Sequence, residues 1–291
     1  MINIYYKFRN KFTMNRYIPM RVVYKNNYSF YKSNQKKLIV ATHCGRAGVE
    51  WIADIFDNHQ NCVGIVEKFP LEESFYRYCH WYGIETNHSR MIYLLQDLFI
   101  NLWKKYDIIF YGSPWLSANI KFFQTELKPD QTWILFRNKL DNVKSFLNKG
   151  WYDEIEQTED RILPGLSLSS KYLHHSFSRI LPLKNTCPDF YKVGKFGKNS
   201  WYWENYNNFI LDQTTENKLK VKIIKLENLD QNYDYFKKLT KNLSLNYVSE
   251  NKFLSIKYKI KNKGRYKNNF NFSEKEMSEF NLFKSFSNRF Y

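Results

Sequence analysis

The sequence predicts an α/β protein, a three-layer sandwich in which helices cover both faces of a central parallel sheet. Short apolar runs at 38–41, 108–111, 133–136 and 221–226 have the length and composition of buried strands. The segments between them repeat apolar residues at helical spacing. Strands that alternate with helices are typical of parallel sheets, and no internal repeat points to a solenoid.

Composition limits the class of protein. The chain has 291 residues, and 43% of them are hydrophobic, which argues against general disorder. The formal net charge of +17 favours anionic partners, such as nucleic acid, an anionic membrane, or phosphorylated and sulfated ligands. The cysteines form no C-x-x-C pair and share no metal-ligand spacing with histidines, so we expect reduced thiols in a cytosol-like compartment.

The first third of the chain contains the first predicted strand. Residues 1–36 are basic, aromatic and not periodic, so we expect an irregular extension before a single domain over 37–291. The start of the chain lacks the apolar core of a signal peptide, and no run of about 18 apolar residues predicts a transmembrane helix. After the strand at 38–41, Trp51 and Ile55 recur at helical spacing. Three further helices are expected, at 71–82, 89–105 and 117–127.

The second half of the chain is less regular. Residues 150–200 read as a long excursion or lid, and a helix at 199–212 leads to the last strand. A Lys/Arg-rich segment follows at 252–268. The last helix is predicted over 273–287, because Ser273 and Glu276 fit a capping box.

The loop after the first strand carries the chemistry. It joins a buried strand to an amphipathic helix through Gly45-Arg46-Ala47-Gly48. Backbone N–H groups, a helix N-terminus and one fixed cation together favour a bound anion. The loop lacks the pattern G-x-x-x-x-G-K-[ST], so a magnesium-dependent NTPase is disfavoured.

A second segment has the same character. Arg137 follows the strand at 133–136, and Ser145 lies on the helix after it. Ligands of open parallel sheets bind at the carboxyl ends of strands, and the planar Arg fork suits phosphate oxygens. A surface salt bridge between Arg137 and Asp141 is the alternative.

These segments resemble the sulfotransferases that use 3′-phosphoadenosine 5′-phosphosulfate (PAPS). Arg46-Ala47-Gly48-Val49 is similar to the family's loop [KR]-[SG]-G-T. Arg137 to Ser145 is similar to R-[DN]-P-x-D-x-x-x-S and has the same offset of eight residues, 145 − 137. Lys225-Leu226-Glu227-Asn228-Leu229 looks like the family's Y-E-D-L segment. The resemblance spans about 37–250.

The resemblance implies a P-loop-NTPase-like sulfotransferase fold and a cytoplasmic enzyme. It would move a sulfuryl group from PAPS to a hydroxyl or amine and release 3′,5′-ADP (PAP), without a metal. Arg46 and the N–H groups of Ala47, Gly48 and Val49 would hold the 5′-phosphosulfate. Arg137 and Ser145 would hold the 3′-phosphate. The candidates for covering this phosphate lie in a Gly-containing basic loop: Lys192, Lys195 and Lys198. A mobile lysine loop is the alternative.

The resemblance also implies a catalytic base. The branch that modifies protein tyrosines, with related bacterial members, has a Glu soon after the loop Arg. Here Glu67 lies 21 residues beyond Arg46, 67 − 46, after the turn at 59–61 and the apolar run 63–66. Burial would raise its pKa and Arg46 would lower it. A solvated or salt-bridged Glu67 is the alternative. The rival bases are Glu72, Glu73, His43 and His80.

Three positions depart from the family pattern. Val49 and Glu50 replace hydroxyl residues, and Ser113 stands before Pro114 where many relatives have Lys or His. An inactive relative is therefore one alternative. The others are a polyanion-binding protein that uses 252–268, and a P-loop nucleotide kinase. No nucleic-acid motif is present, so no specific nucleic-acid partner is expected. The acceptor can be a carbohydrate, lipid, small metabolite or peptide.

Overall fold

A computed structural model describes residues 28–32, 36–153, 177, 180–183, 186–230, 232–258 and 271–290. Its centre is a sheet of five parallel strands in the order β2-β3-β1-β4-β5. The strands are β1 (Lys37–His43), β2 (Cys62–Val66), β3 (Ile108–Gly112), β4 (Gln131–Phe136) and β5 (Lys222–Lys225). The α/β class with a parallel sheet is thus confirmed.

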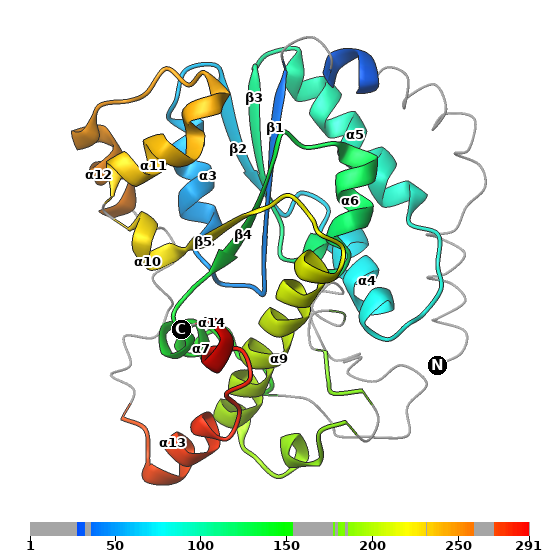
Figure 1. Cartoon of the computed structure of the whole chain (residues 1–291), viewed down its shortest axis with the longest axis vertical. Coiled ribbons are helices and arrows are strands. Elements are labelled where there is room, and N and C mark those ends of the chain that lie inside the picture. Colours follow the sequence, from blue (N-terminus) through cyan, green and yellow to red (C-terminus); the bar gives the residue numbers. More distant parts are fainter. Residues whose placement is uncertain are drawn as a thin grey trace.

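Helices cover both faces of this sheet (Figure 1). One face carries α3 (Val49–Asp57), α10 (Leu226–Leu229), α11 (Tyr233–Thr240) and α12 (Glu250–Tyr258). The other carries α4 (Pro70–Trp81), α5 (Ser89–Trp103), α6 (Ile120–Leu127) and α9 (Lys195–Glu216). Short 3₁₀ turns lie at η2 (Trp115–Ala118), η3 (Pro188–Tyr191) and η4 (Lys241–Leu243). The result is the three-layer sandwich that the sequence predicts.

Alternation along the strands explains why they read as unbroken apolar runs. Ile39 and Ala41 of β1 face the core under α3, whereas Leu38 and Val40 face the core under α5. A strand buried on both faces has no polar alternation. The two cores are separate clusters, one on each side of the sheet.

The order of strands creates one switch point. β1 and β4 pair directly, with His43 opposite Leu135 at their carboxyl ends. The chain leaves β1 toward β2 at one edge and leaves β4 toward β5 at the other. Ligands of open α/β sheets bind in the crevice outside such a point. The fold therefore puts the residues after His43 and after Phe136 where a ligand is expected.

Part of the predicted N-terminal extension belongs to the fold. Residues 28–32 are helical, and the buried Tyr28 donates a hydrogen bond to the carbonyl of Leu127 at 2.5 Å. Lys32 forms an ion pair with Asp130. Irregular structure was therefore the wrong expectation for this stretch, because an aromatic anchor ties it to the end of α6. Residues 1–27 lie outside the described chain.

The predicted lid is only partly described. Residues 154–176, 178–179 and 184–185 lie outside the described chain. α9 begins at Lys195, so the end of the expected excursion is helix. In the basic segment, 252–258 belongs to α12, and 259–268 is outside the described residues.

The C-terminal part is not one helix. The capping box of Ser273 and Glu276 opens α13 (Glu274–Asn281), as predicted, but a separate α14 (Ser287–Phe290) follows. The prediction of one helix over 273–287 is wrong. Lys139 donates to the carbonyls of Phe280 and Phe283, which are therefore bound by a side chain from another helix.

None of the helices in the described ranges is both long and apolar enough to cross a bilayer.

Candidate functional site

The loop after β1 has an unusual backbone. Gly45, Arg46 and Gly48 all have positive φ, at 114°, 54° and 76°. Arg46 is the one without glycine's freedom, and such strain at a non-glycine residue is characteristic of functional sites. Gly48 is the N-cap of α3, and no side chain caps this helix. Within the described chain, no group accepts a hydrogen bond from the N–H of Ala47 or Gly48. The helix N-terminus is therefore available for an anion.

The structure brings Arg46, Arg137 and Ser145 together. Arg46 Nε donates to Ser145 Oγ at 3.0 Å, and Arg137 Nη1 donates to the backbone carbonyl of Arg46 at 3.2 Å. Burial lowers the pKa of Arg46, and the Arg137 charge lowers it further. No ion pair joins Arg137 to Asp141 among the described residues. We call Arg46, Arg137, Ser145 and the N-terminus of α3 the anion cradle.

Contacts of the next residue, Asn138, fix the backbone beside Arg137 at the end of β4. Asn138 is the N-cap of α7 (Lys139–Leu147), and its side chain accepts from the N–H of Asp141. The N–H of Asn138 donates to Glu227 Oε1 at 2.6 Å. Glu227 thus makes a structural contact at the start of α7.

Glu67 lies at the carboxyl end of β2. Its N–H donates to the carbonyl of Gly112 at 2.9 Å, and its φ is 45°. Burial raises the pKa of Glu67 to about 7, and the Glu50 charge raises it further. Arg46 and Arg77 act in the opposite direction. A carboxyl with a pKa near neutrality suits a general base.

A second carboxyl group, that of Glu73, lies close enough to Glu67 for the two charges to interact. It is fully buried, and its oxygens accept from Tyr111 Oη, Ser113 Oγ and, at 3.1 Å, the N–H of Phe69. Burial raises the pKa of Glu73 to about 7 against these donors. Ser113, at the position expected to carry a cation, is thus engaged with an acid. Glu72, the other rival carboxyl group on α4, forms an ion pair with Arg90 at 3.6 Å.

Arg77 is a residue that sequence reasoning missed. It is 0% exposed, and its Nη1 donates to Tyr202 Oη at 2.5 Å. Tyr202 Oη in turn donates to the carbonyl of Cys44 at 2.6 Å, beside the cradle loop. The guanidinium lies 4.6 Å from the Trp115 ring centroid. The only sequence signal was its place one helical turn after Glu73, in a segment rich in aromatic residues.

Val49 and Glu50, the two departures from the family pattern in the cradle loop, differ in exposure: Val49 is buried and Glu50 is exposed. The Val49 side chain is buried against Gly112, where a Cβ would collide with it. Only its backbone N–H can serve an anion. The Glu50 side chain is 52% exposed, and its Oε1 lies 4.0 Å from Arg46 Nη1. Glu50 thus partly neutralises Arg46 at the solvent side of the cradle.

The other predicted candidates lie elsewhere or are inert. His43 is buried, and its Nδ1 accepts from the N–H of Gly45 at 2.9 Å. Burial, then Arg46, lowers the pKa of His43 to about 3, so it is neutral and braces the loop. Lys195 pairs with Asp153 at 3.1 Å. Its assignment to the cradle therefore has no contact in its favour.

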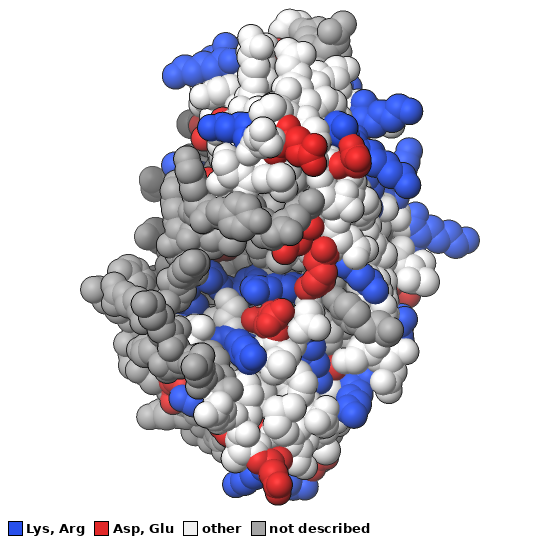
Figure 2. Space-filling view, turned by 90° about the vertical axis from the view of Figure 1, so that its left-hand side faces the viewer, with Lys and Arg blue, Asp and Glu red and all other residues white. Residues whose placement is uncertain are grey.

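Figure 2 shows the side of the molecule that lies at the left in Figure 1. At the height where the strands end, Lys and Arg atoms lie in a recess, and Asp and Glu atoms border it.

Comparisons with family models, curated proteins and solved structures find no match to this chain. Among the described residues, no group of three or more His, Cys, Asp or Glu is placed to hold a metal ion.

Proposed function

We propose that this chain is a PAPS-dependent sulfotransferase that moves a sulfuryl group to a hydroxyl or amine acceptor. One observation carries the proposal: two guanidinium groups, a serine hydroxyl and an uncapped helix N-terminus converge at the switch point of a parallel sheet. Glu67, whose pKa is about 7, lies close enough to Arg46 for the Arg46 charge to lower this pKa.

The donors of the cradle fit the charges of PAPS. Arg137 donates only one described hydrogen bond, so most of its planar fork is free for phosphate oxygens. Arg46 donates from Nε to Ser145, and its Nη1 lies 4.0 Å from Glu50 Oε1. Hydrogen bonds to charged groups contribute about 1.5–3 kcal/mol each, so a few of them support micromolar binding at about −8 kcal/mol.

In the proposed reaction Glu67 acts as the base. PAPS, when bound, supplies the sulfuryl group and a stable phosphate leaving group. Glu67 takes the proton of the acceptor hydroxyl while the acceptor oxygen forms a bond to sulfur. At the same time the bond between sulfur and the bridging phosphate oxygen breaks. That bond's electron pair stays on the phosphate, where Arg46 and the N–H groups of Ala47 and Gly48 stabilise the charge. Glu67 later loses its proton to solvent.

A PAP-binding protein without turnover is the second candidate. Two observations favour it: Glu50 lies beside Arg46, and Ser113 donates to Glu73 where a cation is expected. Binding and turnover must therefore be measured separately.

Calorimetric titration with PAP and with ATP tests the binding half. We expect PAP to bind more tightly, and Arg46→Ala or Arg137→Ala to weaken it about tenfold or more. Arg289→Ala is the matched control, because Arg289 pairs with Asp212 on the surface. Absence of PAP binding, or equal affinity for ATP, contradicts the proposal.

Glu67→Gln tests the catalytic half. The acceptor is first found by screening carbohydrates, lipids, small metabolites and peptides for sulfated products. With that acceptor, we expect the Glu67→Gln variant to lose turnover by a factor of about 10²–10⁴ and to keep its affinity for PAP. Unchanged turnover removes Glu67 from the mechanism. PAP binding without turnover for any acceptor supports the second candidate.

A further inference from the structure

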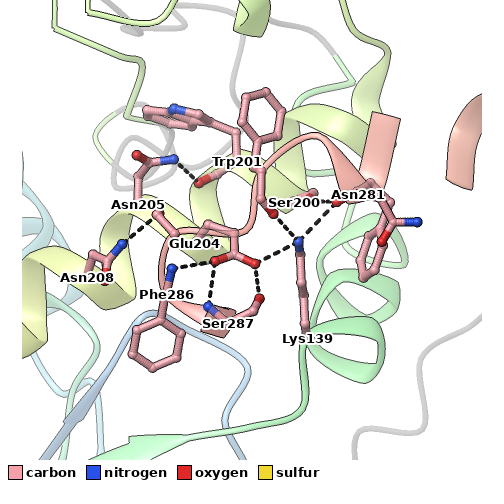
Figure 3. Close-up of polar contacts among 12 residues, drawn as sticks. Lys139, Ser200, Trp201, Glu204, Asn205, Asn208, Asn281, Phe286 and Ser287 are labelled. Atoms are coloured by element: carbon pink, nitrogen blue, oxygen red, sulfur yellow. Dashed lines mark hydrogen bonds and ion pairs between the residues drawn. The ribbon is translucent and has the colours of Figure 1, made fainter. Parts of the chain in front are cut away.

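An ion pair behind the cradle joins three elements. Lys139 is the first residue of α7, two positions after Arg137, and its Nζ lies 2.7 Å from Glu204 Oε1 on α9. The same Nζ donates to the carbonyls of Phe280 at 3.0 Å and Phe283 at 2.5 Å (Figure 3). An ammonium group has three donors, and these three acceptors use all of them. Lys139 is therefore a structural hub and has no donor left for a ligand.

Glu204 is equally well satisfied. Its side chain is 0% exposed. Its Oε2 accepts from the N–H of Phe286 at 2.7 Å and of Ser287 at 2.9 Å, and its Oε1 accepts from Ser287 Oγ (Figure 3). Ser200, one turn earlier on α9, donates to the carbonyl of Phe280 at 2.7 Å. The pair thus clamps the segment 271–290 onto α7 and α9.

The cost of this pair points to a role beyond stability. Two apolar side chains at such a site are often as stabilising as a buried ion pair or more so, because desolvation offsets the Coulomb attraction. An ion pair whose atoms all have hydrogen-bond partners instead fixes the relative orientation of the elements that it joins. Here it fixes the orientation of the first turn of α7, next to Arg137. From the other side, Glu227 holds the N–H of Asn138 at 2.6 Å.

We propose that Lys139 and Glu204 are a positioning pair for the anion cradle. They fix the first turn of α7 and so set the approach of Arg137 and Ser145 to Arg46. Both contacts to Arg46, at 3.0 and 3.2 Å, depend on the position of this turn. The pair reaches a ligand only through these residues. The proposal rests on the proposed function for PAP, but its second probe, inorganic pyrophosphate, does not.

The test measures affinity for both probes by calorimetry. Glu204→Gln and Lys139→Met are expected to weaken binding about tenfold. The double variant Lys139→Met/Glu204→Leu leaves no unpaired buried charge, so it keeps its fold if a single variant does not. We expect its urea midpoint to recover and its affinity to stay low. An affinity that recovers with stability overturns the proposal. Lys139→Arg, which keeps charge and donors, is expected to bind better than Lys139→Met.

Coupling to Arg137 supplies the second readout. If the pair acts through Arg137, then Arg137→Ala costs less in the Lys139→Met/Glu204→Leu background than in the wild-type chain. Additive losses overturn the proposal. Asp212→Asn is the control, because Asp212 also joins α9 to the C-terminal segment, through Arg289 at 2.7 Å. We expect it to leave both affinities unchanged.

The outcomes separate the two proposals. Coupled binding of pyrophosphate without binding of PAP supports the positioning pair and contradicts the sulfotransferase. Binding of PAP without coupling contradicts the positioning pair alone. A wild-type chain that binds neither probe overturns both.

Discussion

The chemistry of the site depends on two carboxyl groups with similar pKa values and different surroundings. Glu67 is partly exposed and faces charges of both signs, whereas Glu73 is fully buried among neutral donors. Only Glu67 can meet a substrate from solvent. Glu73 instead affects stability, because its ionisation is resisted by burial.

Glu73 should make the protein less stable as the pH rises. Its folded pKa of about 7 is above the ordinary 4.5, so its stabilising contribution is complete below pH 4.5 and is lost through pH 7. The loss at pH 7 is roughly 3 kcal/mol. Glu73→Gln should remove this part of the pH dependence. Urea unfolding of both proteins between pH 4.5 and 7.5 measures it, and parallel curves would contradict the assignment.

Glu50 should tune both charges of the cradle. Its negative charge raises the pKa of Glu67 and pairs with Arg46. Glu50→Gln should therefore lower the pKa of Glu67, so that the base form persists to lower pH. It should also strengthen anion binding by up to about fivefold, since Glu50 is exposed to solvent and its attraction to Arg46 is screened. Carbon-13 NMR of labelled Glu67 follows the first effect and calorimetry the second. A pKa that stays constant or rises would count against this arrangement.

At the scale of elements, the turn between β1 and α3 requires glycine at position 48. The backbone there has φ 76°, and a Cβ would lie 2.8 Å from Leu226. Gly83 offers a matched control, with φ 63° and no heavy atom within 4 Å of a Cβ. Gly83→Ala should cost only the left-handed strain, about 1–2 kcal/mol. Gly48→Ala should cost more and should also weaken anion binding, because Leu226 must move. Equal unfolding free energies for the two variants would refute this account.

The sequence predicts the elements that depend on local pattern. Apolar runs locate β1, β3, β4 and β5 to within two residues. For β1, β3 and β4 the reason is burial on both faces, which leaves an unbroken apolar run. β2 was anticipated only as the run 63–66 before Glu67. The break between α13 and α14 was not predictable, because it depends on Lys139, which is remote in sequence.

The candidate site also contains residues that the sequence predicts and residues that it does not. Strand ends and motif spacing predict Arg46, Arg137 and Ser145 as anion-binding residues, and in the structure they contact one another. Arg77 and Glu204 could not be predicted, because charged residues on helices are usually solvated. Only the tertiary partners, an aromatic cluster for Arg77 and the C-terminal segment for Glu204, make their burial tolerable. Lys195 shows the converse, a lysine in a suggestive loop whose partner is a surface aspartate.

At the scale of the whole molecule, the anion cradle follows interior strands of the sheet, whereas the proposed base follows an edge strand. Arg46 and Arg137 follow β1 and β4, which have a neighbour on each side, whereas Glu67 follows β2 at the edge of the sheet. Edge elements tend to open in local fluctuations before a central strand does. Mild urea should therefore abolish turnover at concentrations that still permit PAP binding. Hydrogen exchange should be faster in 62–66 than in 37–43, and simultaneous loss of both activities would show that the sheet opens as one unit.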